Sequence, residues 1–183
     1  MAAGLVATGT VYAESCLRCK RIHIQKDDDT DIALIDAVLL RNDFIGSLLP
    51  FNAEDLSTIV LSRAEPAAIG ISPIGGFITP VGHVDDGGVM VECNDAAHRR
   101  INVPISPGLH REVGIESTRK LTLEEVVQFN GPGILAFDGD RTLKLAEGES
   151  ATALIRRDGP RIIEAERVMT QAAASKLFEY THK

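Results

Sequence analysis

The sequence predicts a mainly β fold, a β-sandwich with short helices at its two ends. Two observations predict this class. Short stretches of strand-forming residues follow one another at spacings of about 8 to 12 residues, with turn-forming residues between them. The 183 residues are 44% hydrophobic and 25% charged, which is typical of one globular domain with a substantial core. We therefore expect residues 1–183 to form a single domain.

The N-terminal half begins with a short helical stretch and continues with strands. Ala2–Arg18 is rich in alanine, and its apolar residues have loosely helical spacing, which predicts one or two helical turns that packed against an upstream part of the protein. From Arg21 the apolar period changes to two, and a polar break at Lys26–Thr30 predicts a hairpin. After the break, the pattern continues through Ile32 and Leu34 into the apolar run Ala37–Leu40.

The middle of the chain alternates between strand and turn signals. Asn52–Leu56 places a polar cap before a short helix, and Thr58–Arg63 follows as a strand. We expect Ala68–Ser72 to form a buried strand that ends at Pro73. The glycine-rich stretch within and after this segment favours turns or close backbone approaches, and its glycines are Gly70, Gly75, Gly76, Gly82, Gly87 and Gly88.

The C-terminal half is a series of short strands followed by a helix. The predicted strands are Val89–Cys93, Ile101–Ile105, Arg111–Glu116, Lys120–Gln128, Gly133–Phe137, Arg141–Leu145, Ser150–Ile155 and Pro160–Ala165. Asp138-Gly139 between two of them is the strongest local hairpin signal. After Glu164 the apolar spacing becomes helical.

The charge of the chain argues against nucleic acid as a partner. The formal net charge is -7, so the surface repels polyanions. The basic cluster Arg18–Arg21 is followed by Asp27–Asp29, which favours a solvated flank over a phosphate track. No apolar run approaches the roughly 20 residues that span a bilayer, and the first residues lack a secretory signal. We expect a cytoplasmic protein that binds neither nucleic acid nor membrane.

The cysteines favour reduced thiols. The chain contains three, Cys16, Cys19 and Cys93, an odd number that argues against a disulfide framework. Cys16 and Cys19 form a CxxC, but a structural zinc site needs four ligands and there is no second pair. We expect this pair to lie at the end of a helix, outside the strand–CxxC–helix context of a redox motif.

Four segments carry a more specific signal, and they are Ile32–Val38, Ile69–Gly76, Val103–Gly108 and Asp138–Asp140. In this order they are similar to A-L-N-E/D-V, T-P-T-G-S, T-P-I-A-P-H and D-G-Q, which are landmarks of the C-terminal domain of ATP-NAD kinases. The resemblance is closest to the branch typified by acetoin catabolism protein X. Asp36 keeps the acidic residue, whereas Ile35, Gly76 and Gly108 replace Asn, Ser and His.

The resemblance implies a ligand-binding role. By it, the chain is a C-terminal domain that binds NAD or a nucleotide-like small molecule and contributes to a homo-oligomer. The implied ligand-binding residues are Asp36, Ser72, Pro73, Ile74, Gly75, Gly76, Ile105, Ser106 and Asp138. It implies no catalytic residue and no metal ligand in this chain.

The phosphoryl-transfer motif of the resembled kinases is not present. In those proteins a G-G-D-G turn in an upstream domain binds the triphosphate, and its Asp is the proposed base. Here the nearest string, Asp85–Gly88, has the letters in another order. We expect the chain to lack the N-terminal domain and to hold no cofactor, because ATP and Mg²⁺ would need that domain. With it, the reaction would be ATP-dependent phosphorylation of NAD or a related substrate; alone, we expect no kinase activity.

Several polar residues have two interpretations. Asp36 either accepts ribose hydroxyls or points to solvent. His83, Asp85 and Asp86 either bind a metal or lie on a solvated loop, which we favour. Ser72 and Ser106 lack the G-x-S-x-G context of a hydrolase. The alternative to a ligand-binding domain is a non-catalytic oligomeric or regulatory module that binds no nucleotide.

Overall fold

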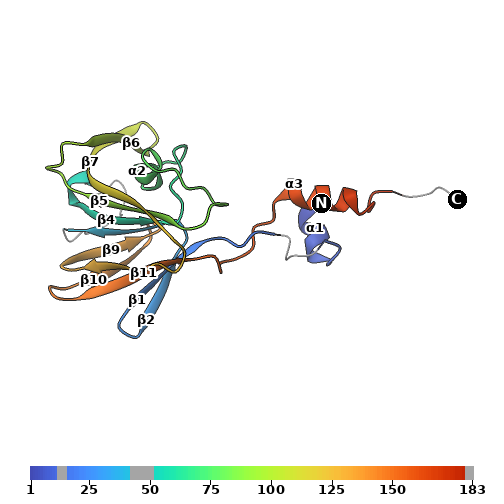
Figure 1. Cartoon of the computed structure of the whole chain (residues 1–183), viewed down its shortest axis with the longest axis horizontal. Coiled ribbons are helices and arrows are strands. Elements are labelled where there is room, and N and C mark those ends of the chain that lie inside the picture. The colour runs from blue at the N-terminus through green and yellow to red at the C-terminus, as the bar shows by residue number, and fades with distance from the viewer. Residues whose placement is uncertain (12–15, 42–51, 180–183) are drawn as a thin grey trace. The chain divides into compact units, whose positions relative to one another are not determined.

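The strands form two antiparallel sheets (Figure 1). The structure is a computed structural model that describes residues 1–11, 16–41 and 52–179. Contacts divide the chain into two compact units. Lys20–Arg157 is the β unit, and Met1–Cys19 together with Asp158–Lys183 is the terminal unit. The predicted mainly β fold with short helices is confirmed.

The larger sheet of the β unit has seven strands in the order β10-β9-β3-β4-β5-β7-β6. Their bounds are β3 (Asp36–Leu40), β4 (Leu56–Leu61), β5 (Gly88–Cys93), β6 (Arg100–Ser106), β7 (Leu109–Leu121), β9 (Gly133–Phe137) and β10 (Arg141–Leu145). The smaller sheet has the order β2-β1-β11-β8. Its strands are β1 (Arg21–Lys26), β2 (Asp29–Ala33), β8 (Val127–Asn130) and β11 (Ser150–Arg156).

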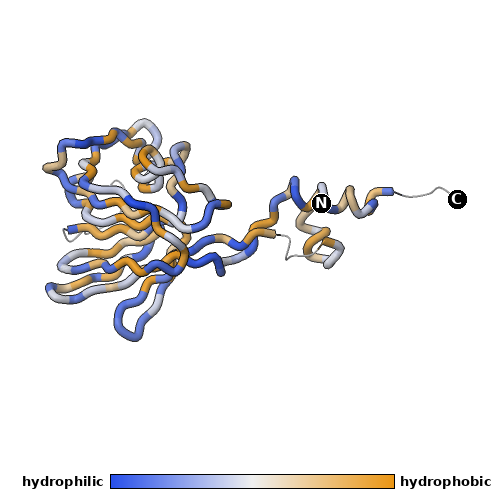
Figure 2. Tube along the Cα trace, viewed as in Figure 1, coloured by the Kyte–Doolittle hydropathy of each residue, from blue (hydrophilic) through white to orange (hydrophobic). Residues whose placement is uncertain are grey.

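Two hydrophobic cores cover the two faces of the larger sheet. Because side chains alternate along a strand, Val38 and Leu40 of β3 enter one core, whereas Leu39 enters the other. The second core lies between the two sheets. Ile22 and Phe129 of the smaller sheet belong to this core. Figure 2 shows hydrophobic residues along the strands and hydrophilic residues at the hairpin tips. The central strands are therefore apolar at nearly every position.

The segment predicted as the buried strand Ala68–Ser72 is a loop followed by helix α2 (Ser72–Gly76). Pro73 lies in the first turn of this helix, where the missing N–H of proline costs nothing. All five residues of α2 are buried. A Cβ on Gly76 would lie 2.7 Å from the backbone of Glu65 and Pro66. The glycines therefore allow a helix to pack where the sequence suggested a strand and turn.

Three further predictions are corrected. Arg111–Glu116 belongs to one long strand, β7, which also takes the start of the predicted strand Lys120–Gln128 and ends at Leu121 because the chain turns there. Pro160–Ala165 forms one bridge, between Arg161 and Arg18, before a helix begins. Cys16–Cys19 is not helical, since the first helix ends at Ala7 and the cysteines lie in an irregular segment.

The loop 82–87 is held by two buried or half-buried cations through its carbonyl groups. Lys20 Nζ donates to Gly82 O at 2.9 Å and to Gly87 O at 2.8 Å. Arg157 donates to carbonyls in the same loop and pairs with Asp86 at 2.9 Å. Burial lowers the pKa of Lys20 to about 8. The described residues contain no group of three or more His, Cys, Asp or Glu side chains that could hold a metal.

The terminal unit contains helices α1 (Ala2–Ala7) and α3 (Ala165–Ala174). Backbone hydrogen bonds join its two chain segments, from Cys19 N–H to Pro160 O at 2.8 Å and from Ile162 N–H to Leu17 O at 2.9 Å. The cysteines are free thiols, as expected. Among the described helices, none is long and apolar enough to cross a bilayer.

A strand threonine gives the first prediction. The Thr118 hydroxyl on β7 is buried and has no hydrogen-bond partner in the described part of the chain, and such a group destabilises the folded state. We expect Thr118→Val, which keeps the shape, to raise the free energy of unfolding by about 1 kcal/mol, measured by urea denaturation.

The matched control is Thr58→Val on β4, because the Thr58 hydroxyl donates to Glu92 at 2.8 Å. In that variant the free energy of unfolding should fall by about 1.5–3 kcal/mol, the typical contribution of a hydrogen bond to a charged group. Equal effects of the two substitutions would contradict the assignment of an unpartnered hydroxyl at position 118.

Candidate functional site

A pocket of about 190 Å³ lies against one face of the larger sheet, within the β unit. Asp36, Val38 and Leu40 alternate along β3 and therefore face the same side. The remaining lining residues come from β4, from the loop before α2, from β9 and from the following turn, and they are Leu56, Ile69, Gly70, Ile71, Ala136, Asp138 and Gly139. The walls are apolar, and the polar side chains are the two carboxylic acids.

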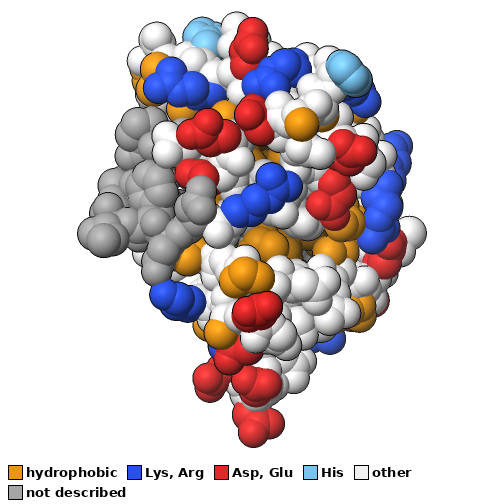
Figure 3. All heavy atoms as spheres, turned by 90° about the vertical axis from the view of Figure 1, so that its left-hand side faces the viewer, with side chains coloured by type: hydrophobic (Ala, Val, Ile, Leu, Met, Phe, Trp, Pro, Cys, Tyr) orange, Lys and Arg blue, Asp and Glu red, His pale blue; other side chains and the backbone are white. Residues whose placement is uncertain are grey.

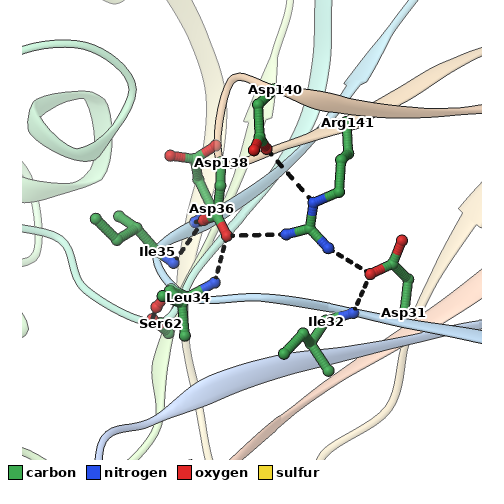
Figure 4. A network of polar contacts seen from close by, with 9 residues as sticks. All are labelled: Asp31, Ile32, Leu34, Ile35, Asp36, Ser62, Asp138, Asp140 and Arg141. Atoms are coloured by element: carbon green, nitrogen blue, oxygen red, sulfur yellow. Dashed lines mark hydrogen bonds and ion pairs between the residues drawn. The ribbon is translucent and has the colours of Figure 1, made fainter.

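Asp138 reaches the start of β3 because β9 pairs with β3, with Ala37 opposite Phe137. Its carboxylate accepts the Leu34 N–H at 2.7 Å and the Ile35 N–H at 2.9 Å (Figure 4). From the other side, the Ser62 hydroxyl donates to Leu34 O at 2.6 Å. The backbone just before Asp36 is therefore fixed on both sides by side-chain hydrogen bonds.

Arg141 lies among three carboxylates (Figure 4). It pairs with Asp31, with Asp138 at 3.4 Å and with Asp140 at 3.4 Å. Its guanidinium also lies 5.1 Å from the centroid of the Phe137 ring, within the range of a cation–π contact. One cation against three acids leaves the surroundings of Asp138 net negative.

Asp36 has a strongly perturbed acidity. Burial, together with the negative charge of Asp138, raises the pKa of its carboxyl from 3.8 to about 7, while the Asp138 amide opposes the shift. Near neutral pH this carboxyl therefore exists both as a hydrogen-bond donor and as an acceptor. Such perturbation within a pocket is typical of functional sites.

The other predicted ligand-binding residues lie apart from this carboxyl pair. The Ser72 hydroxyl donates to Arg63 O at 2.8 Å and accepts the Glu65 N–H at 2.9 Å. It belongs to α2, whose other predicted members, also buried, are Pro73, Ile74, Gly75 and Gly76. Ile105 is buried in a core, and Ser106 ends β6.

The third motif, Val103–Gly108, contacts the pocket wall through the backbone of Pro104. The Gly70 N–H donates to Pro104 O at 2.9 Å, so β6 supports the loop that covers the pocket. Gly70 has a φ of +101°, which favours glycine at this position. The ligand roles of Ser72, Ile105 and Ser106 stay predictions.

Six apolar side chains of the lining were not among the predicted site residues, although Ile69 and Ile71 belong to the second motif. The six are Val38, Leu40, Leu56, Ile69, Ile71 and Ala136. Strand alternation could have assigned Val38 and Leu40 to the face of Asp36, since they follow it by two and four residues. No local signal marks Leu56 or Ala136, because only the pairing of β4 and β9 with β3 brings them there.

Comparison with known proteins shows the family of the chain. Residues 20–158 match the family model of the acetoin catabolism protein X C-terminal domain. The chain belongs to this family. The match coincides closely with the β unit, Lys20–Arg157, which contains the whole pocket. The family confirms the resemblance to the acetoin-type branch.

A curated member is similar along almost the whole chain. Acetoin catabolism protein X of Cupriavidus necator is 31% identical over 186 residues, which cover 97% of this chain and 52% of the relative. The chain thus spans about half the length of that relative.

The acidity of Asp36 predicts a pH dependence of stability. Its pKa is higher in the folded state than in the unfolded state, so its contribution is present at low pH and is lost as pH rises from about 4 to about 7. In Asp36→Asn the side chain does not ionise, so its free energy of unfolding does not fall for this reason. The difference in free energy of unfolding, variant minus wild type, should therefore increase by on the order of a few kcal/mol from pH 4.5 to pH 8.

Urea denaturation at the two pH values measures this difference. Asp28→Asn in the exposed β1–β2 turn is the matched control and should follow the wild-type profile. A variant Asp36→Asn that also follows that profile would show that the Asp36 carboxyl ionises normally.

The hydrogen bonds of Asp138 predict a positioning role. Asp138→Ala leaves the Leu34 and Ile35 amides without this acceptor, so we expect a loss of about 1–3 kcal/mol of stability. The same variant removes a neighbouring negative charge and should lower the pKa of Asp36, as read from a carboxyl NMR titration. Asp140→Ala, whose side chain is 73% exposed, should change neither quantity measurably.

Proposed function

We propose that the β unit of this family member binds the nucleoside part of NAD or of a related nucleotide in the pocket beside Asp36. The observation that carries the proposal is the partly buried Asp36 carboxyl, with its raised pKa, in a pocket whose side chains are apolar apart from Asp36 and Asp138. Apolar pocket walls suit the ring of a nucleobase, and a carboxylate accepts hydrogen bonds from ribose hydroxyls. The resemblance supports it, because Asp36 stands where the ATP-NAD kinases carry the acidic residue that reaches the nucleoside.

The size of the pocket limits what it holds. Its volume of about 190 Å³ is below the roughly 300–1,000 Å³ typical of small-molecule sites. A single nucleoside part therefore suits it better than a complete dinucleotide, whose remainder would extend outside.

The charges indicate which part of the ligand enters. Among the residues that the structure describes, no lysine or arginine lines the pocket, and the carboxylates of Asp138 in the lining and of Asp140 near it repel phosphates. Figure 3 shows acidic side chains gathered at the lower end of one face of the β unit and charges of both signs over the rest of that face. We propose that the phosphates point away from Asp36, and that nucleic acid is not a partner.

Phosphoryl transfer is proposed only for a protein that adds the phosphate-binding half. The transfer needs a metal-bound phosphate cradle, and the described residues supply neither a cluster of metal ligands nor a G-G-D-G turn. In such a protein the pocket would hold the acceptor substrate and the β unit would contribute to the homo-oligomer. The 183-residue chain alone is proposed to lack kinase activity.

A second candidate function is a non-catalytic oligomeric or regulatory module. It is favoured by the internal use of several motif residues. The Ser72 hydroxyl, the Gly76 backbone and the Asp138 carboxylate all hold the fold together, so the motifs have a structural reason to exist without a ligand.

Calorimetry with NAD tests the proposed binding. If the ionised carboxylate accepts the ribose hydroxyls, affinity scales with the ionised fraction of Asp36. With a pKa of about 7, binding should be about tenfold tighter at pH 8 than at pH 6. It should vanish in Asp36→Ala and persist in the control Asp28→Ala.

Two results would decide against parts of the proposal. An absence of heat with NAD and with ATP at both pH values would favour the module that binds no nucleotide. Conversion of NAD to NADP by the purified chain with ATP and Mg²⁺ would contradict the proposed lack of kinase activity.

A further inference from the structure

The terminal unit has a very small hydrophobic core. Its buried apolar residues in the described part of the chain are Val11, Cys16, Val168 and Ala172. Helix α1 contains no buried residue, and Leu5 and Val6 are only partly covered. A pair of helices with so little buried apolar surface is marginal on its own, because burial must offset the entropy of ordering the chain.

The same unit exposes apolar side chains. Leu177 and Phe178, just after α3, are 42% and 45% exposed, and Ile163 before α3 is 41% exposed. Figure 2 shows hydrophobic residues on both helices. A small unit that leaves large apolar side chains in solvent carries the features of an interaction surface.

The family comparison separates this unit from the rest of the chain. The C-terminal domain model covers residues 20–158 and so leaves out nearly all of the terminal unit. The match to the Cupriavidus necator protein, however, covers 97% of the chain. Most of the two segments of the unit therefore aligns with the relative, although it lies outside residues 20–158 of this chain.

We propose that the terminal unit is a docking surface for a polypeptide equivalent to the half of acetoin catabolism protein X that this chain does not span. The chain covers 52% of that protein, so a second half of similar length exists there. Docking completes the core around Val168 and Ala172 and covers Leu177 and Phe178. The proposal does not depend on nucleotide binding at Asp36.

Association in trans is the direct test. The full 183-residue chain is mixed with the separately expressed other half of the Cupriavidus necator protein, and their mass is measured by light scattering after size exclusion. We expect a one-to-one complex. The double variant Leu177→Asp, Phe178→Asp should weaken it at least tenfold, because the substituted side chains are exposed in the free chain and buried on docking.

The matched control is Val126→Asp, since Val126 is an apolar side chain of the β unit that is 58% exposed. It should leave the association unchanged. As a second measurement, the same half is joined to the chain by a flexible linker, and hydrogen exchange is compared with that of the chain alone. We expect the amides of α1 and α3 to exchange at least tenfold more slowly when joined.

Two outcomes overturn the proposal. One is the absence of both a complex in trans and added protection in the joined protein. The other is a homodimer of the chain alone that Leu177→Asp, Phe178→Asp dissociates, which would assign the surface to a second copy. Calorimetry with NAD reports on the β unit separately, so failure of docking and failure of nucleotide binding remain distinguishable.

Discussion

The burial of β3 on both of its faces is the constraint on which the β unit depends. Alternate residues of this strand enter two different cores, so its positions 37–40 are all apolar and buried. Asp36, at the same strand's first position, is the exception. A carboxyl at the edge of two cores is costly to ionise, and its raised pKa follows directly from that position. The candidate site is thus a consequence of the sheet's architecture.

Asp138 shows how the fold sustains this exception. The pairing of β9 with β3 brings its carboxylate to the amides of Leu34 and Ile35, and Arg141 balances part of its charge. Both acids line the pocket, but Asp138 uses its oxygens to hold the backbone, whereas Asp36 offers a carboxyl that can exchange a proton near neutral pH. Two acids close together thus have different roles.

Local signals in the sequence predicted much of this arrangement. The period-two pattern from Arg21 and the Asp138-Gly139 turn correctly predicted two hairpins. The segment 68–76 was predicted wrongly because Pro73 ends a strand as readily as it begins a helix. The close packing of Gly76 against Glu65 and Pro66 favours the helix, and this contact is not visible in the local sequence. Leu56 and Ala136 join the pocket through strand pairing, which is non-local and leaves no pattern in the sequence near them.

The pocket and the terminal unit differ in which physical property is small. In the described residues the pocket has a volume of about 190 Å³ and no lining cation, whereas the terminal unit has little buried apolar surface. Exposed apolar residues such as Phe178 lower solubility and line no part of the pocket. Burial of these residues by a docked polypeptide would therefore stabilise the terminal unit without changing the pocket, and the two proposals depend on separate features of the chain.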